Sequence, residues 1–197
     1  MSPVLTVHAA GPLMTVQDMG RRGVTARGLS RGGAVDRLAI LEAAALLNAP
    51  EPVPAIEMAG KGGEFSFSGP ARIALTGAPM RAFLDDAPIA WNATHAVQPE
   101  QRLTIGSVVS GTYGYLTPAR SIALRPSLGG VSAHLAAGLG STLRTGDEVP
   151  LENEAPPEAP PRRLAVADRF RGGVVRVMPG PQTDLFSDEV RRRFFST

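Results

Sequence analysis

The chain has 197 residues, of which 43% are hydrophobic and 19% charged, a balance typical of an ordinary soluble globular protein. Twenty basic residues against 18 acidic ones leave a formal charge of only +2, and no dense basic stripe is interleaved with aromatic side chains, so we expect no nucleic-acid partner. The absence of cysteine excludes disulfides and thiolate chemistry, and three scattered histidines predict that the chain holds no metal.

Glycine and proline are abundant, with 22 and 18 residues, whereas aromatic residues make up only 5% of the chain. This composition favours short elements joined by turns, so we expect a mainly β fold with a few helices. No basic segment followed by a long apolar run opens the chain, and no apolar run approaches the length of a membrane span. We therefore expect a cytoplasmic protein that has no membrane partner.

The first predicted elements are a short strand over residues 3–8 and a long loop over residues 12–36. The loop is dense in glycine, which interrupts regular periodicity, and long ordered loops in compact domains are often functional. Asp36 is expected to cap a helix over residues 37–47, because leucine and alanine recur there at three- and four-residue spacing. The sequence Asn-Ala-Pro at residues 48–50 ends this helix.

Residues 55–151 consist of short segments typical of strands, separated by turns. Phe65 and Phe67 alternate with serines, as in a half-buried strand, and Asp85-Asp86 predicts a tight hairpin. Residues 60–63 (Gly-Lys-Gly-Gly) also predict a hairpin turn rather than a phosphate loop, because no helix follows them. Strands at regular spacing indicate a barrel or a sandwich, and we expect them at residues 55–58, 63–67, 71–76, 82–84, 87–89, 102–105 and 114–117.

Three regions are expected along the chain, at residues 1–151, 152–163 and 164–197. The first is the β-barrel-type domain with its glycine-rich loop and one helix. The second is a linker, because its repeated prolines and glutamates keep it extended. The third is expected to hold a strand at 174–178 and a helix at 190–195 that follows a Ser187 cap, and it is interpreted as the beginning of a second domain that is otherwise absent.

The loop segment at residues 15–23 contains a carboxylate, an amide, two arginines and two glycines. Asp18 and Arg21 are expected to meet across a glycine turn, where they would either position an anionic group or pin the loop by one salt bridge. Residue types alone favour the pinned loop.

Gly32 and Gly33 precede the helix and resemble a set of backbone amides suited to binding an anion, although capping alone explains Asp36. Ser132 and His134 lie two residues apart, but no nucleophile-elbow motif surrounds them and no acid is evident to orient the histidine. We therefore do not expect them to form a catalytic pair.

Several motifs along the chain together carry a resemblance to a known family. They are Thr15-Val16-Gln17-Asp18-x-Gly20-Arg21-x-Gly23, Gly33-Ala34-x-Asp36, Ala55-Ile56-Glu57, Ala74-Leu75-Thr76-Gly77-Ala78, Leu143-Arg144-x-Gly146-Asp147-x-x-Pro150-Leu151 and Arg176-Val177-x-Pro179-Gly180-Pro181-Gln182-x-x-x-Phe186. In this order they resemble the family of the bacterial 5-oxoprolinase C subunit, which is also known as KipA or allophanate hydrolase subunit 2.

The resemblance implies a cyclophilin-like β-barrel fold and an enzymatic role. The C subunit of this family works with the A and B subunits in the ATP-dependent opening of 5-oxoproline to glutamate. It is also similar to part of the carboxyltransferase region of biotin-dependent urea carboxylase. The implied partners are a B-like subunit, the A subunit, and a small amide or lactam substrate. No cofactor is expected on this chain, while the complex would use ATP, and biotin on a carrier protein would take part if the chain is a carboxyltransferase.

The resemblance also implies the residues of the site. Asp18, Arg21 and Asp36 are expected to be catalytic. The expected substrate contacts are Gln17, Gly32, Gly33, Glu57, Thr76 and Ser132. Two alternatives to the 5-oxoprolinase role stay open, namely a carboxyltransferase component of a urea or amide carboxylase and a non-catalytic partner that regulates a B-like subunit.

The chain departs from the family pattern in its middle and at its end. The family's Gly-Gly-Ile and Gly-Ser-x-Ser-Thr segments are replaced here by residues 119–122 (Ala-Arg-Ser-Ile) and 129–134 (Gly-Gly-Val-Ser-Ala-His). If this region shapes the site, the substrate has changed or the activity is lost. The family's second domain follows the last helix, whereas the sequence given stops at Thr197, and three explanations stay open, namely a truncated chain, a proteolysed product and a naturally short paralogue.

Overall fold

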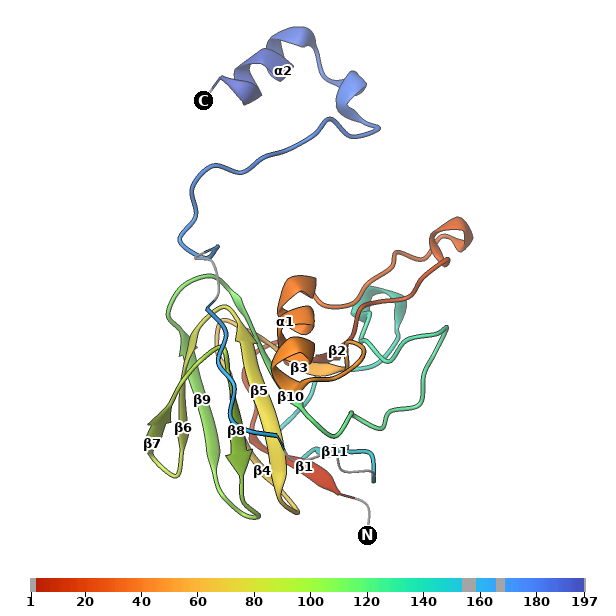
Figure 1. Cartoon of the computed structure of the whole chain (residues 1–197). Coiled ribbons are helices and arrows are strands. Elements are labelled where there is room, and N and C mark those ends of the chain that lie inside the picture. Colours follow the sequence, from red (N-terminus) through yellow and green to blue (C-terminus); the bar gives the residue numbers. More distant parts are fainter. Residues whose placement is uncertain (1–2, 154–158, 166–168, 197) are drawn as a thin grey trace.

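The computed structural model describes residues 3–153, 159–165 and 169–196. In this part of the chain two antiparallel sheets pack against each other (Figure 1). The first sheet has the strand order β11-β1-β4-β9-β6-β7, with β1 (Val4–Ala9), β4 (Glu64–Phe67), β6 (Met80–Leu84), β7 (Ala87–Ile89), β9 (Leu103–Val108) and β11 (Glu148–Pro150). The second has the order β2-β3-β10-β5-β8, with β2 (Thr15–Gln17), β3 (Ala55–Ala59), β5 (Ala71–Gly77), β8 (Ala93–Val97) and β10 (Tyr113–Pro118).

The main core lies between the two sheets. Alternate residues point inward, so Ile56, Leu75 and Leu116 of the second sheet meet Phe65 and Leu103 of the first, and all five are fully buried. Burying such side chains contributes about 1.5–3 kcal/mol each. The predicted mainly β fold of the barrel type is confirmed, because sheets that enclose one apolar core make up most of the described chain.

The outer face of the second sheet carries Ala55, Ala74 and Tyr115, which pack on the apolar side of helix α1 (Arg37–Leu47) that covers it. The predicted helix is confirmed at both ends. The Asp36 side chain accepts a hydrogen bond from the Ala39 amide at 3.3 Å, and Asn48 takes the left-handed conformation that ends the helix. Thr76 donates its hydroxyl to the Ala39 carbonyl at 2.9 Å and thereby ties the helix to β5.

Three details of the predicted β region are corrected. The long loop at residues 12–36 contains strand β2 and the 3₁₀ turn η1 (Thr25–Arg27), because a three-residue strand is too short to show periodicity. Residues 60–63 are not a hairpin turn, since they connect β3 and β4, which belong to different sheets. The sequence also failed to predict β8 and β11, the strands that end the two sheets, although the Asp85-Asp86 hairpin between β6 and β7 is confirmed.

Part of the predicted linker adds to a sheet edge. The Thr94 amide donates to the Arg162 carbonyl, and the Leu164 amide donates to the Asn92 carbonyl, both at 2.9 Å. This extended segment therefore lies beside β8. Residues 154–158 of the predicted linker lie outside the described residues.

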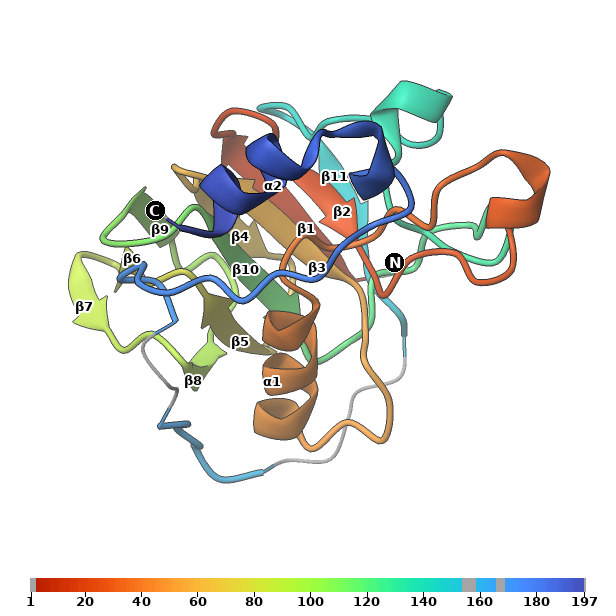
Figure 2. The same ribbon diagram turned by 90° about the horizontal axis from the view of Figure 1, so that it is seen from above.

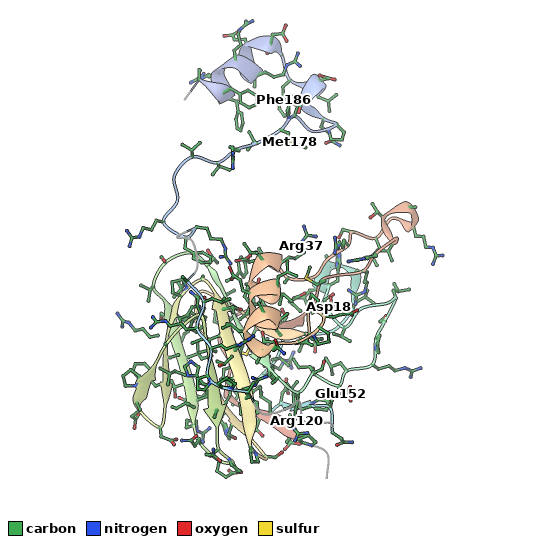
Figure 3. The ribbon with its side chains drawn as sticks, viewed as in Figure 1. Asp18, Arg37, Arg120, Glu152, Met178 and Phe186 are labelled. Atoms are coloured by element: carbon green, nitrogen blue, oxygen red, sulfur yellow. The ribbon has the colours of Figure 1, made fainter. Side chains whose placement is uncertain are left out.

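Residues 169–196, which we call the C-terminal arm, extend away from the sheets and end in α2 (Asp188–Phe195) (Figures 1 and 2). Ser187 caps α2 as predicted, but the predicted strand at 174–178 is wrong, because no neighbouring segment of the described chain supplies the ladder hydrogen bonds that a strand needs. Met178 and Phe186 on the arm are 87% and 56% exposed and lie far from the sheets (Figure 3).

Arg169 fixes the start of the arm to α1. Its guanidinium donates to both carboxylate oxygens of Glu42, at 2.7 and 2.9 Å, and to Asp36 at 2.9 Å. Burial lowers the pKa of Arg169, but the hydrogen bonds to the two carboxylates outweigh it and the net pKa is raised. The arm therefore leaves the barrel at a defined point.

Candidate functional site

The side chain of Arg21 anchors the loop that runs from residue 124 to residue 143. Its Nε donates to the Ser127 carbonyl at 2.9 Å, its Nη1 to the Ser132 hydroxyl at 3.0 Å and its Nη2 to the Ser132 carbonyl at 2.8 Å. Arg21 is only 2% exposed. No carboxylate in the described chain forms an ion pair with it, so its positive charge is held by neutral oxygens.

Asp18 holds the same loop from a neighbouring position. Its Oδ1 accepts from the Gly20 amide and its Oδ2 from the Val131 amide, both at 2.7 Å. The expected salt bridge between Asp18 and Arg21 is not formed in the described chain, since the two side chains flank Gly130 and pin the loop separately through backbone groups. A backbone amide is a ready partner for a carboxylate, and the sequence does not reveal it.

A pocket of about 270 Å³ lies between β2 and this loop. Arg21 and Ser132 form part of its wall, and Arg125, Ser127 and Ser141 are exposed at its rim. Its lining contains no acidic residue. A pocket with two guanidinium groups, hydroxyls and no carboxylate favours an anionic ligand.

Gln17 and the glycine pair lie beside this pocket. The Gln17 amide donates to the Thr15 hydroxyl at 2.9 Å and to the Ala133 carbonyl at 3.2 Å, while its own Oε1 is buried without a partner in the described chain. Gly33 packs on the backbone of Gly20 and Asp18, so closely that a Cβ would lie 2.5 Å from the Gly20 nitrogen. Gly33 thus packs two loop segments together, whereas Gly32 is exposed beside the His134 ring.

Asp36, Glu57 and Thr76 form a second group beneath α1. Glu57 is 6% exposed, and its Oε2 accepts from the Tyr115 hydroxyl at 2.7 Å and from the Val35 amide at 2.9 Å. Burial raises the pKa of Glu57, and these two hydrogen bonds oppose that shift. Burial and the Glu57 charge also raise the pKa of Tyr115.

The segment at residues 33–36 connects the two groups. The Ala34 amide donates to the Asp18 carbonyl at 2.9 Å, and the next amide, that of Val35, donates to Glu57. The amides of the segment before the helix are therefore bonded to the protein's own groups. Figure 3 shows Asp18 between α1 and the two projecting loops.

Sequence reasoning missed several residues of this region. Tyr115, Arg125, Ser141 and Arg169 lie outside the recognised motifs, and only their placement by the fold brings them to the site. His134 pairs with the Ser30 hydroxyl at 2.6 Å and not with Ser132. Within the described ranges, no three His, Asp or Glu side chains gather as metal ligands. No described helix is long and apolar enough to cross a membrane.

Comparison with known proteins supports the resemblance seen in the motifs. The chain is 33% identical to the 5-oxoprolinase C subunit of Haemophilus influenzae over 176 residues, which is 87% of this chain and 56% of that protein. It is 31% identical to the 5-oxoprolinase C subunit of Escherichia coli over 187 residues, 93% of this chain and 60% of that protein. The chain thus spans somewhat over half the length of these curated relatives.

Urea-metabolising enzymes match as well. A putative urea carboxylase of Emericella nidulans is 36% identical over 107 residues, which is 54% of this chain and 9% of that protein.

Among solved structures, TTHA0988 superposes with a TM-score of 0.88 at 28% identity, over 97% of this chain and 38% of that one. The urea amidolyase of K. lactis superposes with a TM-score of 0.73 at 28% identity, over 77% of this chain and 10% of that one. A family model described as carboxyltransferase domain, subdomain A and B, matches residues 27–197. The chain therefore belongs to the carboxyltransferase domain family of subdomains A and B.

Proposed function

We propose that the chain is the C subunit of an ATP-dependent 5-oxoprolinase, which opens 5-oxoproline to glutamate together with its A and B subunits. The observation that carries this proposal is the acid-free pocket beside Arg21. 5-Oxoproline carries one carboxylate and one lactam group. Guanidinium and hydroxyl groups bind carboxylates through charge-assisted hydrogen bonds. The proposal places the complex in the cytoplasm and assigns ATP consumption to the complex, with no cofactor on this chain.

The rim of the pocket would make the direct contacts to substrate. Arg125 and Ser141 are exposed there and have no side-chain hydrogen bond or ion pair within the described chain. Arg21 already donates through all three of its nitrogens, so it would contribute its charge and hold the loop. Asp18 would act in the same indirect way, through the Val131 amide. Both are therefore positioning residues in this proposal.

The second group of predicted residues, Asp36, Glu57 and Thr76, does not line the pocket and would act on it only indirectly. Glu57 and Thr76 are buried beneath α1, and Asp36 is engaged by Arg169. Their hydrogen bonds fix the N-terminal end of α1 and with it the segment 33–36 that packs on Asp18. In the proposal they support the loops that shape the pocket.

The test is the formation of glutamate and ADP from 5-oxoproline and ATP in a mixture of this chain with its cognate A and B subunits. The proposal expects turnover that requires all three proteins and is independent of bicarbonate and biotin. Absence of turnover with folded cognate partners would refute it. Turnover that is unchanged when this chain is left out would refute it as well.

A second candidate is the carboxyltransferase component of a biotin-dependent urea or amide carboxylase. The similarity to a putative urea carboxylase and the description of the matching family favour it. It predicts ATP consumption that depends on bicarbonate and on a biotinylated carrier protein. The same assay separates the two, because only the carboxylase loses activity when avidin sequesters biotin.

A third candidate is a non-catalytic partner that regulates a B-like subunit. All three nitrogens of the Arg21 guanidinium donate to oxygens of the loop, so this arginine has a structural role that needs no substrate, which favours the regulatory candidate. This role predicts tight binding to the B-like subunit. It also predicts a change in the activity of that partner that is insensitive to substitution of Arg125 and Ser141.

A further inference from the structure

The low net charge of the chain conceals an uneven distribution. Residues 19–35 and 119–146, which we call the basic lobe, contain no Asp or Glu. They contain seven of the chain's 20 basic residues, so the remaining 13 face all 18 acidic ones, a balance of −5. The seven are Arg21, Arg22, Arg27, Arg31, Arg120, Arg125 and Arg144.

The two segments of the basic lobe form one surface. Arg21 of the first segment hydrogen-bonds Ser127 and Ser132 of the second, and Ser30 pairs with His134 at 2.6 Å. Figures 1 and 2 show the loops at residues 19–35 and 124–143 projecting on the same side of the barrel, whereas Arg120 lies beside Glu152 and away from them (Figure 3). Charges that are distant in sequence therefore act together there.

Four arginines of the lobe are not used by the fold. Arg22, Arg27, Arg125 and Arg144 are exposed, and within the described chain their side chains have no hydrogen bond or ion pair. The other three bind carbonyl oxygens, as Arg31 does through Nε to Met19 at 2.9 Å.

The two acids that flank the first segment do not neutralise these charges. Asp18 accepts backbone amides, and Asp36 pairs with Arg169. Asp147, which follows the second segment, accepts the Arg144 amide through Oδ2 at 2.8 Å and balances part of the charge at that end of the lobe. Concentrated like charge that is largely without counter-charge repels itself and attracts acidic ligands.

Exposed apolar side chains lie within the same lobe. Leu124, Leu128 and Leu135 are 36%, 56% and 48% exposed. Apolar anchors surrounded by arginines are typical of protein–protein interfaces. Neither segment contains Phe, Tyr or Trp on which a base could stack, and His134 is held by the Ser30 hydroxyl, which disfavours single-stranded nucleic acid.

We propose that the basic lobe is the docking surface for an acidic face of a partner protein in the 5-oxoprolinase assembly. The proposal rests on the proposed function only in naming the A and B subunits as the candidate partners. Complementary charge would speed the encounter and set the orientation, and the leucines would supply the buried contact. The partner's acidic side chains would also offset the self-repulsion of the lobe.

The test is the Kd of the complete chain for the cognate A and B subunits, measured by interferometry at two salt concentrations. The lobe variant carries Arg22→Ser, Arg27→Ser and Arg144→Ser, which leaves both pocket arginines intact. The control variant carries Arg81→Ser, Arg163→Ser and Arg176→Ser, three exposed arginines outside the lobe. Both lose three positive charges, so any difference reports position and not net charge.

The proposal expects the lobe variant to bind one of the two partners at least about tenfold more weakly, with a shallower salt dependence, while the control stays within about twofold of the parent chain. Hydrogen exchange should show protection over residues 19–35 and 119–146 in the complex. Equal weakening of both variants overturns the proposal, as does failure of the parent chain to bind either partner. Lobe-dependent binding of a single-stranded oligonucleotide or of acidic vesicles, without an effect on binding of the two partners, overturns it too.

These binding outcomes are separable from the outcome of the turnover assay. A complex that binds through the lobe without opening 5-oxoproline refutes the proposed function alone. Turnover combined with lobe-independent binding refutes the docking surface alone.

Discussion

Arg21 holds Ser132 by two hydrogen bonds, one from Nη1 to the hydroxyl at 3.0 Å and one from Nη2 to the carbonyl at 2.8 Å. The two residues are 111 positions apart in sequence, and both are almost fully buried. This contact joins the glycine-rich loop to the loop at residues 124–143 and forms one wall of the pocket. The shape of the candidate site therefore depends on long-range contacts between the two loops, of which this pair and the Asp18–Val131 hydrogen bond are two.

Replacing Arg21 by alanine should destabilise the protein by about 2–4 kcal/mol, because buried carbonyl oxygens at Ser127 and Ser132 lose their donors. Urea denaturation followed by far-UV circular dichroism measures the change. The neighbouring Arg22 is exposed, so Arg22→Ala should stay within about 0.5 kcal/mol of the parent. Equal effects of the two substitutions would show that the contact does not hold the loop.

Two glycines with similar backbone angles give a matched test of loop packing. Gly23 and Gly33 have φ values of 73° and 85°, but a Cβ at Gly23 meets open space, whereas one at Gly33 meets the backbone of Gly20 and Asp18. Gly23→Ala should cost about 1 kcal/mol of unfolding free energy from backbone strain alone. Gly33→Ala should cost at least about 2 kcal/mol more, because backbone atoms must move. Thermal denaturation of both variants measures the two costs, and similar values would mean that Gly33 is not packed against the backbone of Gly20 and Asp18.

Glu57 should make stability depend on pH in a defined direction. Its folded-state pKa is raised above the ordinary value of 4.5, so its contribution is fully present below pH 4.5 and is lost as the pH rises through the raised pKa. Glu57→Gln keeps an oxygen for Tyr115 and Val35 but cannot titrate. The parent should therefore lose stability relative to Glu57→Gln as the pH rises from 4.5 through the raised pKa. Urea midpoints at each pH measure this difference, and a difference that grows in the opposite direction would contradict the account.

Arg169→Ala should release the C-terminal arm and leave the barrel intact. The guanidinium contacts Asp36 and Glu42 while about a quarter exposed, so its loss should change barrel stability by no more than about 1 kcal/mol. Chymotryptic cleavage at Phe186 and hydrogen exchange over residues 170–187 should both become faster. Arg176→Ala, at an exposed position on the same arm, serves as the control. Cleavage at the parental rate in Arg169→Ala would show that the clamp does not hold the arm.

The fold was largely predictable because its elements have local signals. The α1 helix has a capping aspartate and a regular apolar spacing, and the Asp85-Asp86 turn lies between alternating segments. The short strand β2 and the edge strand β11 were missed, because three residues do not establish a period and their pairing depends on distant strands. The strand predicted at residues 174–178 has strand-like residues but no partner in the described chain.

The candidate site was predictable only in part. Arg21 and Ser132 were singled out by their motifs, and the fold brings them together. Asp36, Glu57 and Thr76 came from equally clear motifs but lie beneath α1. Arg125 and Ser141 have no local signal, since only the path of the loop at residues 124–143 brings them to the pocket. The charge pattern also reflects the fold, because the two segments without Asp or Glu, residues 19–35 and 119–146, lie next to each other in the structure.

In the proposed function the pocket beside Arg21 binds the carboxylate of 5-oxoproline. This binding is measured by the steady-state kinetics of the reconstituted complex with Arg125→Ala. The control is Arg163→Ala, which removes an exposed arginine that does not line the pocket. We predict that Arg125→Ala raises KM for 5-oxoproline by at least about tenfold with kcat within about twofold, while Arg163→Ala changes neither. An unchanged KM in Arg125→Ala, with the complex fully assembled, would contradict the claim.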